Sequence, residues 1–339
     1  MSKRKRIGVG YVTITDVKGW DGKAPTYENM VGDISDAPKL AQLTSGKIKK
    51  EDTYTKEEID QIMEKMVRFD NQTYMLFTPD DSSNKIKFRI RTDGIDNVNM
   101  VIKWSKTDYE YETFEIDEDE IVTEREYPDG SQVLLRFTGN VGFQLIDGVL
   151  DDVFQWGTTM TKFVYMEGML SGFKEESLTA QDLCRASYGI SLRNLLENAT
   201  KFNQYLNRWF PRYPGNLSRC FYNCKNFNQS LNNINTTYVT NTSSMFSGCE
   251  KFNKPLYRWS MENNYNSSSM FKDCLDFNQD LNEWDVENIT NMNSMFENVA
   301  MSDKDFSNWN VENVASDKHE NFMVTTGTID NILPTFNED

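Results

Sequence analysis

Five cysteines and a single histidine are the residues of this sequence best suited to metal, redox or nucleophilic chemistry. Cys220 and Cys224 have the spacing of one half of a zinc site. The next cysteines follow at intervals of 25 residues, however, and His319 lies far beyond them. A column of small buried apolar side chains explains this spacing without any chemistry. We therefore expect structural cysteines, with no metal and no cofactor.

Motifs for catalysis are missing from the sequence. It contains no Gly-rich phosphate loop, and no Ser or Cys stands in a nucleophile motif. With 52 Asp and Glu residues, paired carboxylates are too common to indicate an active site. The acidic run 117–120 has two interpretations, a calcium site and a solvated loop, and its spacing fits no calcium-binding loop. We expect a protein that is not an enzyme.

A period of 25 residues organises the second half of the chain. Three columns of the period are Phe202, Phe227, Phe252 and Phe277; Trp209, Trp259, Trp284 and Trp309, with Ile234 in the same register; and Cys224, Cys249 and Cys274. One such unit cannot bury its own apolar face, whereas stacked units share a continuous core. We predict five units over 192–314 whose columns form inward ladders, with irregular first coils at 149–191 and a cap at 315–339.

Tyrosines stand outside these columns. Tyr222, Tyr238, Tyr257 and Tyr265 are the candidates for contact with a glycan or a protein surface, because Tyr combines contact area with a polar tip. The alternative is that they only cover the edges of the coils.

Residues 55–66 predict a short helix. Thr55 and Glu58 form a capping box. The apolar positions recur at three-four spacing, and they are Ile59, Ile62, Met63 and Met66. No partner helix is evident in the first 150 residues, so we expect copies of the chain to bury this stripe against each other. A trimer is favoured; the alternatives are a dimer and docking on another surface.

Residues 71–148 alternate with a period of two. In "KIKFRIR" the side chains of Ile86, Phe88 and Ile90 share one face, and basic residues occupy the other. Further short alternating runs follow, separated by turn signals such as "PDGS". This pattern predicts an all-β sandwich.

Composition excludes several classes of partner. The 339 residues carry a formal charge of −16, which repels phosphate backbones, so we expect no nucleic acid. No apolar run is long enough to span a membrane, and the first residues lack the apolar region of a secretion signal. We expect no membrane partner.

Parts of the chain resemble known families. The units "SSMFSGCEKFNKPLYRW" and "FNQDLNEWDVENITNM" resemble the BspA-like leucine-rich repeats of bacterial surface proteins, and 151–163 is similar to the coil that opens such arrays. "FRIRTD", "VIKW" and "YPDGSQVLLRFTGNVGFQLID" resemble a PKD-like, immunoglobulin-type domain. One departure is "SKT" after Trp104, where that family usually has Gly-Asp-Gly. These resemblances imply a right-handed leucine-rich-repeat-type solenoid after an immunoglobulin-like sandwich.

The stretch "DTYTKEEIDQIMEKM" resembles a segment of bacteriophage tail and head fibre proteins, near their virion-attached end. Together the resemblances imply a multidomain phage head or tail fibre on the virion surface, assembled in the host cytoplasm. Residues 1–70 would be its helix-containing anchor to other virion proteins, and the coils would meet a host-surface glycan or protein. The alternatives are a bacterial cell-surface adhesin expressed without its signal peptide and a glycan-degrading virion enzyme.

Overall fold

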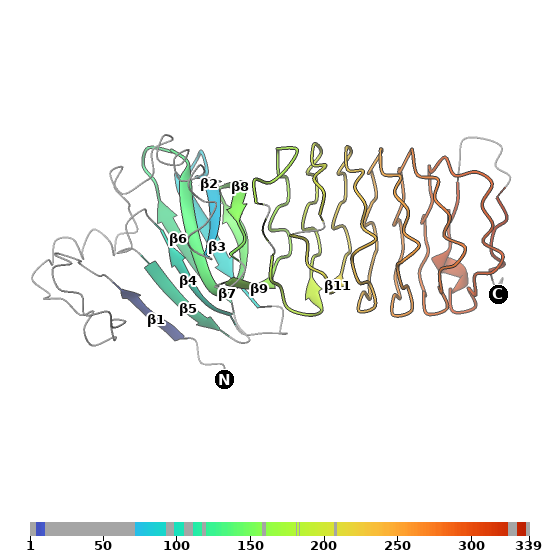
Figure 1. Ribbon diagram of the computed structural model, residues 1–339, viewed down its shortest axis with the longest axis horizontal. Coiled ribbons are helices and arrows are strands. Elements are labelled where there is room, and N and C mark those ends of the chain that lie inside the picture. Colours follow the sequence, from blue (N-terminus) through green and yellow to red (C-terminus); the bar gives the residue numbers. More distant parts are fainter. Residues whose placement is uncertain are drawn as a thin grey trace, which may run out of the picture. The chain divides into compact units, whose positions relative to one another are not determined.

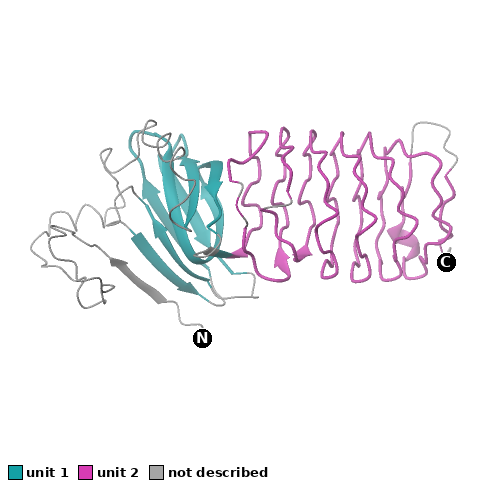
Figure 2. Ribbon diagram, in the orientation of Figure 1, with its two compact units in different colours: residues 1–162 teal, residues 163–339 magenta. Residues whose placement is uncertain are grey.

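The computed structural model describes residues 5–10, 72–92, 98–104, 111–116, 120–157, 161–180, 182, 184–206, 209–324 and 331–336. The chain forms two compact units, residues 1–162 and 163–339 (Figure 2). The predicted helix at 55–66, with its stripe of Ile59, Ile62, Met63 and Met66, lies outside the described residues. So do residues 117–119 of the acidic run and the segment 105–107.

The first unit is an antiparallel β structure (Figure 1). Its strands are β1 (Lys5–Gly10), β2 (Thr73–Thr78), β3 (Lys85–Ile90), β4 (Val98–Lys103), β5 (Tyr111–Ile116), β6 (Ile121–Glu126), β7 (Val133–Asp147) and β8 (Val149–Gln155), and β9 (Thr161–Tyr165) spans the boundary of the units. The main order is β1-β5-β4-β7-β2-β8, and β3 pairs with both β6 and β7. Strand β9 also pairs with β7, so nine strands join in one connected sheet.

The long strand β7 connects β3 and β6 to the rest of the sheet. Its first half pairs with β2 and β4, whereas the stretch from Phe143 to Asp147 pairs with β3. Gly139 lies within this 15-residue strand at a φ of 87°. A Cβ atom there would lie 2.0 Å from the carbonyl oxygen of Asn99, so no other residue fits beside β4 without a shift of the backbone.

Alternating side chains build the core of the first unit. The predicted face of β3 is buried: Ile86, Phe88 and Ile90 are fully covered. The ring of Phe88 lies 5.6 Å from that of Trp104 and 4.9 Å from that of Phe143. The buried Tyr127 hydroxyl donates to the Trp104 carbonyl at 2.9 Å, which satisfies a polar group inside an otherwise aromatic core.

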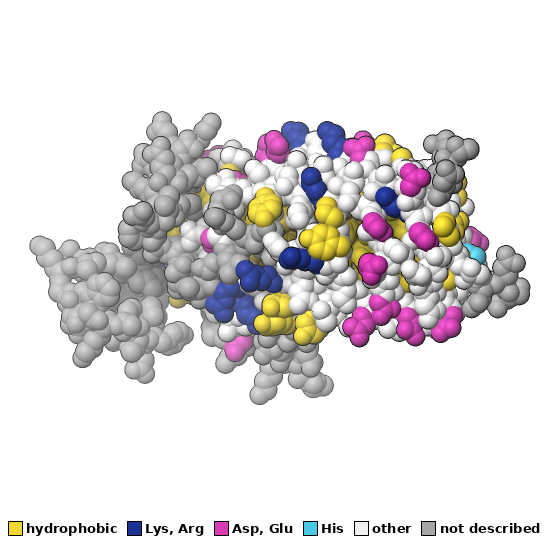
Figure 3. All heavy atoms as spheres, turned by 45° about the vertical axis from the view of Figure 1, so that its right-hand side comes forward, with side chains coloured by type: hydrophobic (Ala, Val, Ile, Leu, Met, Phe, Trp, Pro, Cys, Tyr) yellow, Lys and Arg dark blue, Asp and Glu magenta, His cyan; other side chains and the backbone are white. Residues whose placement is uncertain are grey.

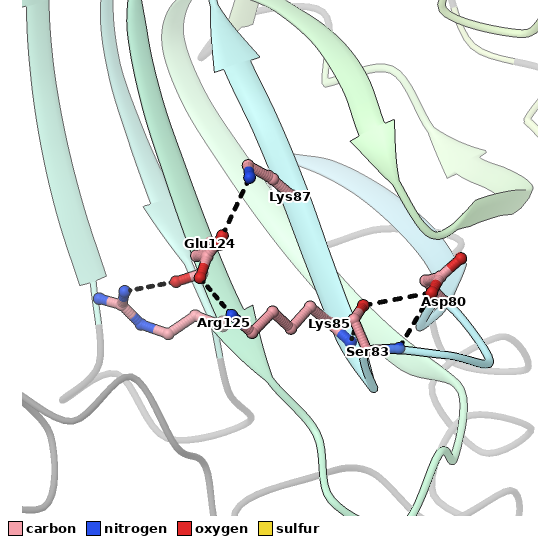
Figure 4. Close-up of polar contacts among 6 residues, drawn as sticks. All are labelled: Asp80, Ser83, Lys85, Lys87, Glu124 and Arg125. Atoms are coloured by element: carbon pink, nitrogen blue, oxygen red, sulfur yellow. Dashed lines mark hydrogen bonds and ion pairs between the residues drawn. The ribbon is translucent and has the colours of Figure 1, made fainter.

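The other face of β3 carries ion pairs (Figure 4). Glu124 of β6 lies between two lysines, with its carboxylate oxygens 2.5 Å from Lys85 Nζ and 3.3 Å from Lys87 Nζ. The hydrogen bond from Lys85 is the main cause of the lowered pKa of Glu124. These pairs link neighbouring strands on the half-exposed side of the sheet, where each contributes little to stability.

The second unit is a stack of turn-rich coils that repeat every 25 residues. Its named elements are β10 (Ile190–Ser191), β11 (Pro214–Asn216) and the 3-10 turn η4 (Ser316–Lys318). Elsewhere single parallel bridges join successive coils, at Asn216–Asn241, Asn241–Asn266 and Asn266–Asn291. Backbone amides extend this pattern: Phe221 donates to Met245 at 3.0 Å, and Phe246 donates to Met270 at 2.9 Å.

Two positions in each of five successive coils have left-handed backbone. Their φ values lie between 52° and 76°. The residues are Asn194, Arg219, Ser244, Ser269 and Ser294 at one position, and Asn198, Asn223, Gly248, Asp273 and Asn298 at the other. Short polar side chains and Gly tolerate this conformation best. The coils therefore turn repeatedly where a continuous strand would need extended backbone.

The predicted fold class is wrong. Within the described residues there is no α-helix, so no helix-containing anchor is seen, and β1 from the N-terminal segment pairs with β5 as an edge strand. The strands join in one sheet through β7, whereas a sandwich has two separate sheets. The coils lack the recurring strand and helix of a leucine-rich repeat, because their left-handed residues break extended backbone.

The boundary between the units also differs from the predicted one. Residues 149–191 were expected to be the first coils of the repeat array. Strand β8 instead pairs with β2, and the second unit begins at Phe163. Leu150, Val153 and Phe154 of this segment are buried, and its pairing with β2 makes it part of the sheet.

Candidate functional site

The inner columns of the coils hold the large aromatic side chains. Trp284 is only 5% exposed, and its ring stacks 6.5 Å from that of Trp259 and 6.4 Å from that of Trp309. Each of these indoles donates its N–H to a leucine carbonyl of the preceding coil; for Trp284 the acceptor is Leu256, at 3.2 Å. The fully buried Phe202, Phe227, Phe252 and Phe277 stack in the same way, with centroids 5.9 to 6.3 Å apart. Trp209 is also buried, but its N–H donates to Gln204.

The cysteine column lies inside the coils as well. All five cysteines are buried free thiols. Cys224, Cys249 and Cys274 each donate to a carbonyl of the preceding coil, at 2.9 to 3.0 Å. Burial raises the pKa of each thiol, so the reactive thiolate is disfavoured. Among the described residues no group of His, Cys, Asp and Glu is arranged to hold a metal ion.

Asparagines join the coils near this core. Asn203, Asn228 and Asn253 each accept, through the side-chain oxygen, the backbone amide of the equivalent asparagine one coil later, at 2.9 to 3.1 Å. These amides serve the scaffold. Surface contacts must therefore come from other positions.

The four predicted contact tyrosines do not form one surface. Tyr222 is half-buried and lies under the guanidinium of Arg219, 3.8 Å from the ring centroid. Tyr238, Tyr257 and Tyr265 are 54%, 63% and 49% exposed. They occupy three different positions of the coil, so the structure does not bring them into one column.

A different set of tyrosines does form a column, and the prediction missed two of its members. Tyr188, Tyr213 and Tyr238, the tyrosine row, are spaced by 25 residues. The rings of Tyr188 and Tyr213 stack at 4.6 Å, and those of Tyr213 and Tyr238 meet edge to face at 6.4 Å. Tyr188 is 67% exposed. The repeat spacing was itself the signal that would have found this row.

Later coils use another residue at this position. There the chain has Asn263, Asn288 and Asn313, and each side-chain amide donates at 2.8 Å to a carbonyl of the preceding coil. At this position an asparagine can thus join neighbouring coils through a hydrogen bond. The first three coils replace that coil-to-coil hydrogen bond with a row of aromatic rings.

A groove of about 550 Å³ adjoins the tyrosine row. Tyr213 belongs to both, and the wall includes Phe210, Arg212, Leu231, Ile234 and Arg258. We call this hollow the coil groove.

Two departures from the repeat explain the groove. Ile234 occupies the column that holds Trp in the other coils, and its shorter side chain leaves space. In the preceding coil the amide of Phe210 donates to Leu206, four residues back, whereas in later coils the Trp amide donates to the residue three positions back. Phe210 thereby turns inward and stacks 5.8 Å from Phe221.

Charge divides the coils into two regions. Residues 184–213 contain five Lys or Arg and one Glu, whereas residues 275–312 contain nine Asp or Glu and one Lys. In the view of Figure 3, acidic side chains gather over the C-terminal coils and basic ones lie toward the opposite end of the described surface. Arg212 and Arg258 are exposed in the coil groove, and neither forms an ion pair within the described part of the chain. The groove is therefore a local basic site on an acidic protein.

Comparison with known families gives a match within the second unit. Residues 165–273 and 215–332 are similar to a family described as "Mycoplasma protein of unknown function, DUF285". Searches of curated proteins and of solved structures found no match. The family description names no activity, so the resemblances to phage fibres, BspA-like repeats and PKD-like domains stay predictions. No helix among the described residues has the length and apolar character to cross a membrane.

Proposed function

We propose that this protein is a non-catalytic attachment protein, a head or tail fibre of a bacteriophage virion that contacts the host surface through its coils. The observation that carries the proposal is the difference between the buried and the exposed large side chains of the coils. Large apolar side chains fill the inner columns, whereas Tyr188 and Tyr238 of the tyrosine row and the two arginines of the coil groove are exposed. Exposed aromatic and arginine side chains are typical of binding surfaces.

The fibre assignment itself rests on sequence resemblance. The "TYTKEEID" stretch resembles the virion-proximal segment of phage fibres, and the repeats resemble bacterial surface arrays. In this proposal residues 1–70 contact other virion proteins.

The test is the location of the protein in an infected culture. An antibody against the recombinant chain should label the head or tail of purified particles in electron micrographs, and peptides of the chain should copurify with the capsid proteins. A protein found only in the bacterial cell envelope would contradict the fibre proposal.

A bacterial cell-surface adhesin is the second candidate. The match of 165–332 to a family described from Mycoplasma, together with the resemblance to bacterial surface repeats, favours it. The same fractionation separates the two candidates, because an adhesin stays with cells that contain no virus.

We also propose that the chain assembles with copies of itself, with a trimer favoured over a dimer. The stripe of Ile59, Ile62, Met63 and Met66 carries this proposal. Light scattering should give the mass of an oligomer for the intact chain and of a monomer for Ile59→Asp/Ile62→Asp. An intact chain that is monomeric, or a variant oligomer of unchanged mass, would exclude this seam.

A further inference from the structure

We infer that the tyrosine row and the coil groove together form a binding site for an extended acidic glycan, a polysaccharide chain that carries carboxylate groups. This inference rests on the proposed attachment function, since it names the class of ligand that the coils would take. Three independent features of the site support it: the aromatic row, the polar lining of the groove and its two arginines.

The aromatic row provides the platform. Tyr188, Tyr213 and Tyr238 run from coil to coil with ring centroids 4.6 and 6.4 Å apart. The row follows the stacking direction of the coils, so it suits a chain-like ligand better than a compact one. Sugar rings present apolar C–H faces to aromatic rings and hydroxyls to polar tips, and tyrosine supplies both surfaces.

In later coils Asn joins the scaffold at this position. At the equivalent positions Asn263, Asn288 and Asn313 join their coils through hydrogen bonds of 2.8 Å. The tyrosines give up this bond and leave Tyr188 and Tyr238 more than half exposed. A contiguous row of exposed aromatic rings is typical of an interaction site.

Polar side chains line the groove beside the row. Asn233, Asn235 and Thr237 are exposed, and Ser230 is half-buried. Amides and hydroxyls both donate and accept hydrogen bonds, which matches the hydroxyls of a sugar. Apolar walls from Leu231 and Ile234 lie behind them.

Arg212 and Arg258 specify an acidic ligand. Both are exposed in the groove, with no carboxylate partner among the described residues. A guanidinium binds a carboxylate through two parallel hydrogen bonds. The net charge of −16 does not oppose this, because ionic screening limits surface fields to about 8 Å at physiological salt.

The test begins with binding of the intact chain to an array of acidic and neutral oligosaccharides, followed by calorimetry with the best ligand. A carboxylated oligosaccharide should bind more tightly than its methyl-esterified form of the same length. The affinity for the acidic form should fall as salt rises.

Substitutions can be taken from the repeat itself, so that the fold is kept. Tyr188→Asn/Tyr213→Asn/Tyr238→Asn installs the residue that later coils use at this position. Arg212→Thr and Arg258→Asn install the residues found one coil away, at Thr237 and Asn233. The triple variant and the double arginine variant should each weaken binding at least about tenfold, a change of about 1.4 kcal/mol. The matched control Tyr222→Ser, which copies Ser247, should bind like the parent.

Three outcomes would overturn the inference: an array with no preference for acidic glycans, equal affinity for the esterified form, or undiminished binding by both variants. Thermal unfolding of each variant identifies a loss of binding that comes from misfolding, and Tyr188→Asn alone, at the most exposed ring, then serves as the milder variant. Preference for a peptide or a nucleic acid over every glycan would also contradict it. The fractionation experiment is separate, so a virion protein without glycan binding refutes only this inference.

Discussion

At the scale of single residues, the inner columns give a prediction about stability. Trp284 is buried between two equivalent tryptophans and donates its indole N–H to Leu256. Replacement of Trp284 with Ala leaves a cavity and removes this donor. The free energy of unfolding should therefore fall by about 3 to 5 kcal/mol. Denaturant titration of the intact chain measures the change. Tyr257→Asn, an exposed substitution by the residue found one coil away, should change stability little; equal midpoints for both variants would contradict the ladder.

The thiols give a second prediction at this scale. Burial raises the pKa of Cys224, Cys249 and Cys274, and each thiol donates to a carbonyl. The thiolate is the reactive form, so a thiol reagent at pH 8 should label the native coils slowly and the denatured chain quickly. Rapid labelling of native protein, followed by peptide mapping to this column, would show that the cysteines are accessible.

At the scale of the elements, a buried ion pair joins β5 and β6. The Glu112 side chain is fully buried, and it accepts hydrogen bonds from Arg125 and, at 2.6 Å, from Thr123. Arg125→Met keeps the stem but leaves a buried carboxylate without its guanidinium, which should cost about 3 to 5 kcal/mol of unfolding free energy. Lys85→Met removes a half-exposed partner of Glu124 and serves as the control, with little change expected in the same titration. If both substitutions lowered the free energy of unfolding by similar amounts, the buried pair would not be more important than the half-exposed one.

Ion pairs between neighbouring coils should make the stability of the fold depend on pH. The hydrogen bond from Lys272 is the main cause of the lowered pKa of Glu297, at an atomic separation of 2.8 Å. A lowered carboxylate pKa stabilises the fold above the ordinary value of 4.5, and this stability is lost as pH falls through the depressed pKa. Glu297→Gln should therefore cost at most about 1 kcal/mol at pH 7. The unfolding free energies of parent and variant should converge in acid. A difference between them that grows in acid would contradict a lowered pKa of Glu297.

The elements also show what sequence patterns can predict. The positions of Trp259 and Phe252 follow from the repeat, because equivalent side chains must share one core. Alternation likewise identifies the buried face of β3. Alternation does not tell how many sheets the strands form, and this depends on the length of β7. The coil groove depends on the packing of Phe210 beside the short Ile234, which no single pattern reveals, whereas the spacing of Tyr188 and Tyr213 was open to detection.

At the scale of the whole molecule, the uneven charge predicts opposite effects of salt on folding and on binding. The formal charge is −16, and residues 275–312 alone hold nine acidic residues and one basic residue. Like charges crowded on adjacent coils repel each other in the folded state, and screening relieves this repulsion. Raising NaCl from about 20 to about 300 mM at pH 7 should therefore raise the unfolding temperature, while retention on an acidic glycan falls.

A charge-reduced variant connects this salt effect to the later coils. Asp285→Asn and Glu287→Thr place there the residue types of Asn235 and Thr237, two coils earlier. The amide oxygen of the introduced asparagine can still accept the backbone N–H of residue 287, as the Asp285 carboxylate does in the parent. Less repulsion remains to be screened in this variant, so its unfolding temperature should start higher and respond less to salt. Its binding to the acidic glycan should keep the salt dependence of the parent, because the arginines of the coil groove are unchanged. An unfolding temperature that falls with salt in the parent would mean that ion pairs such as Lys272–Glu297 outweigh the repulsion among the acidic coils.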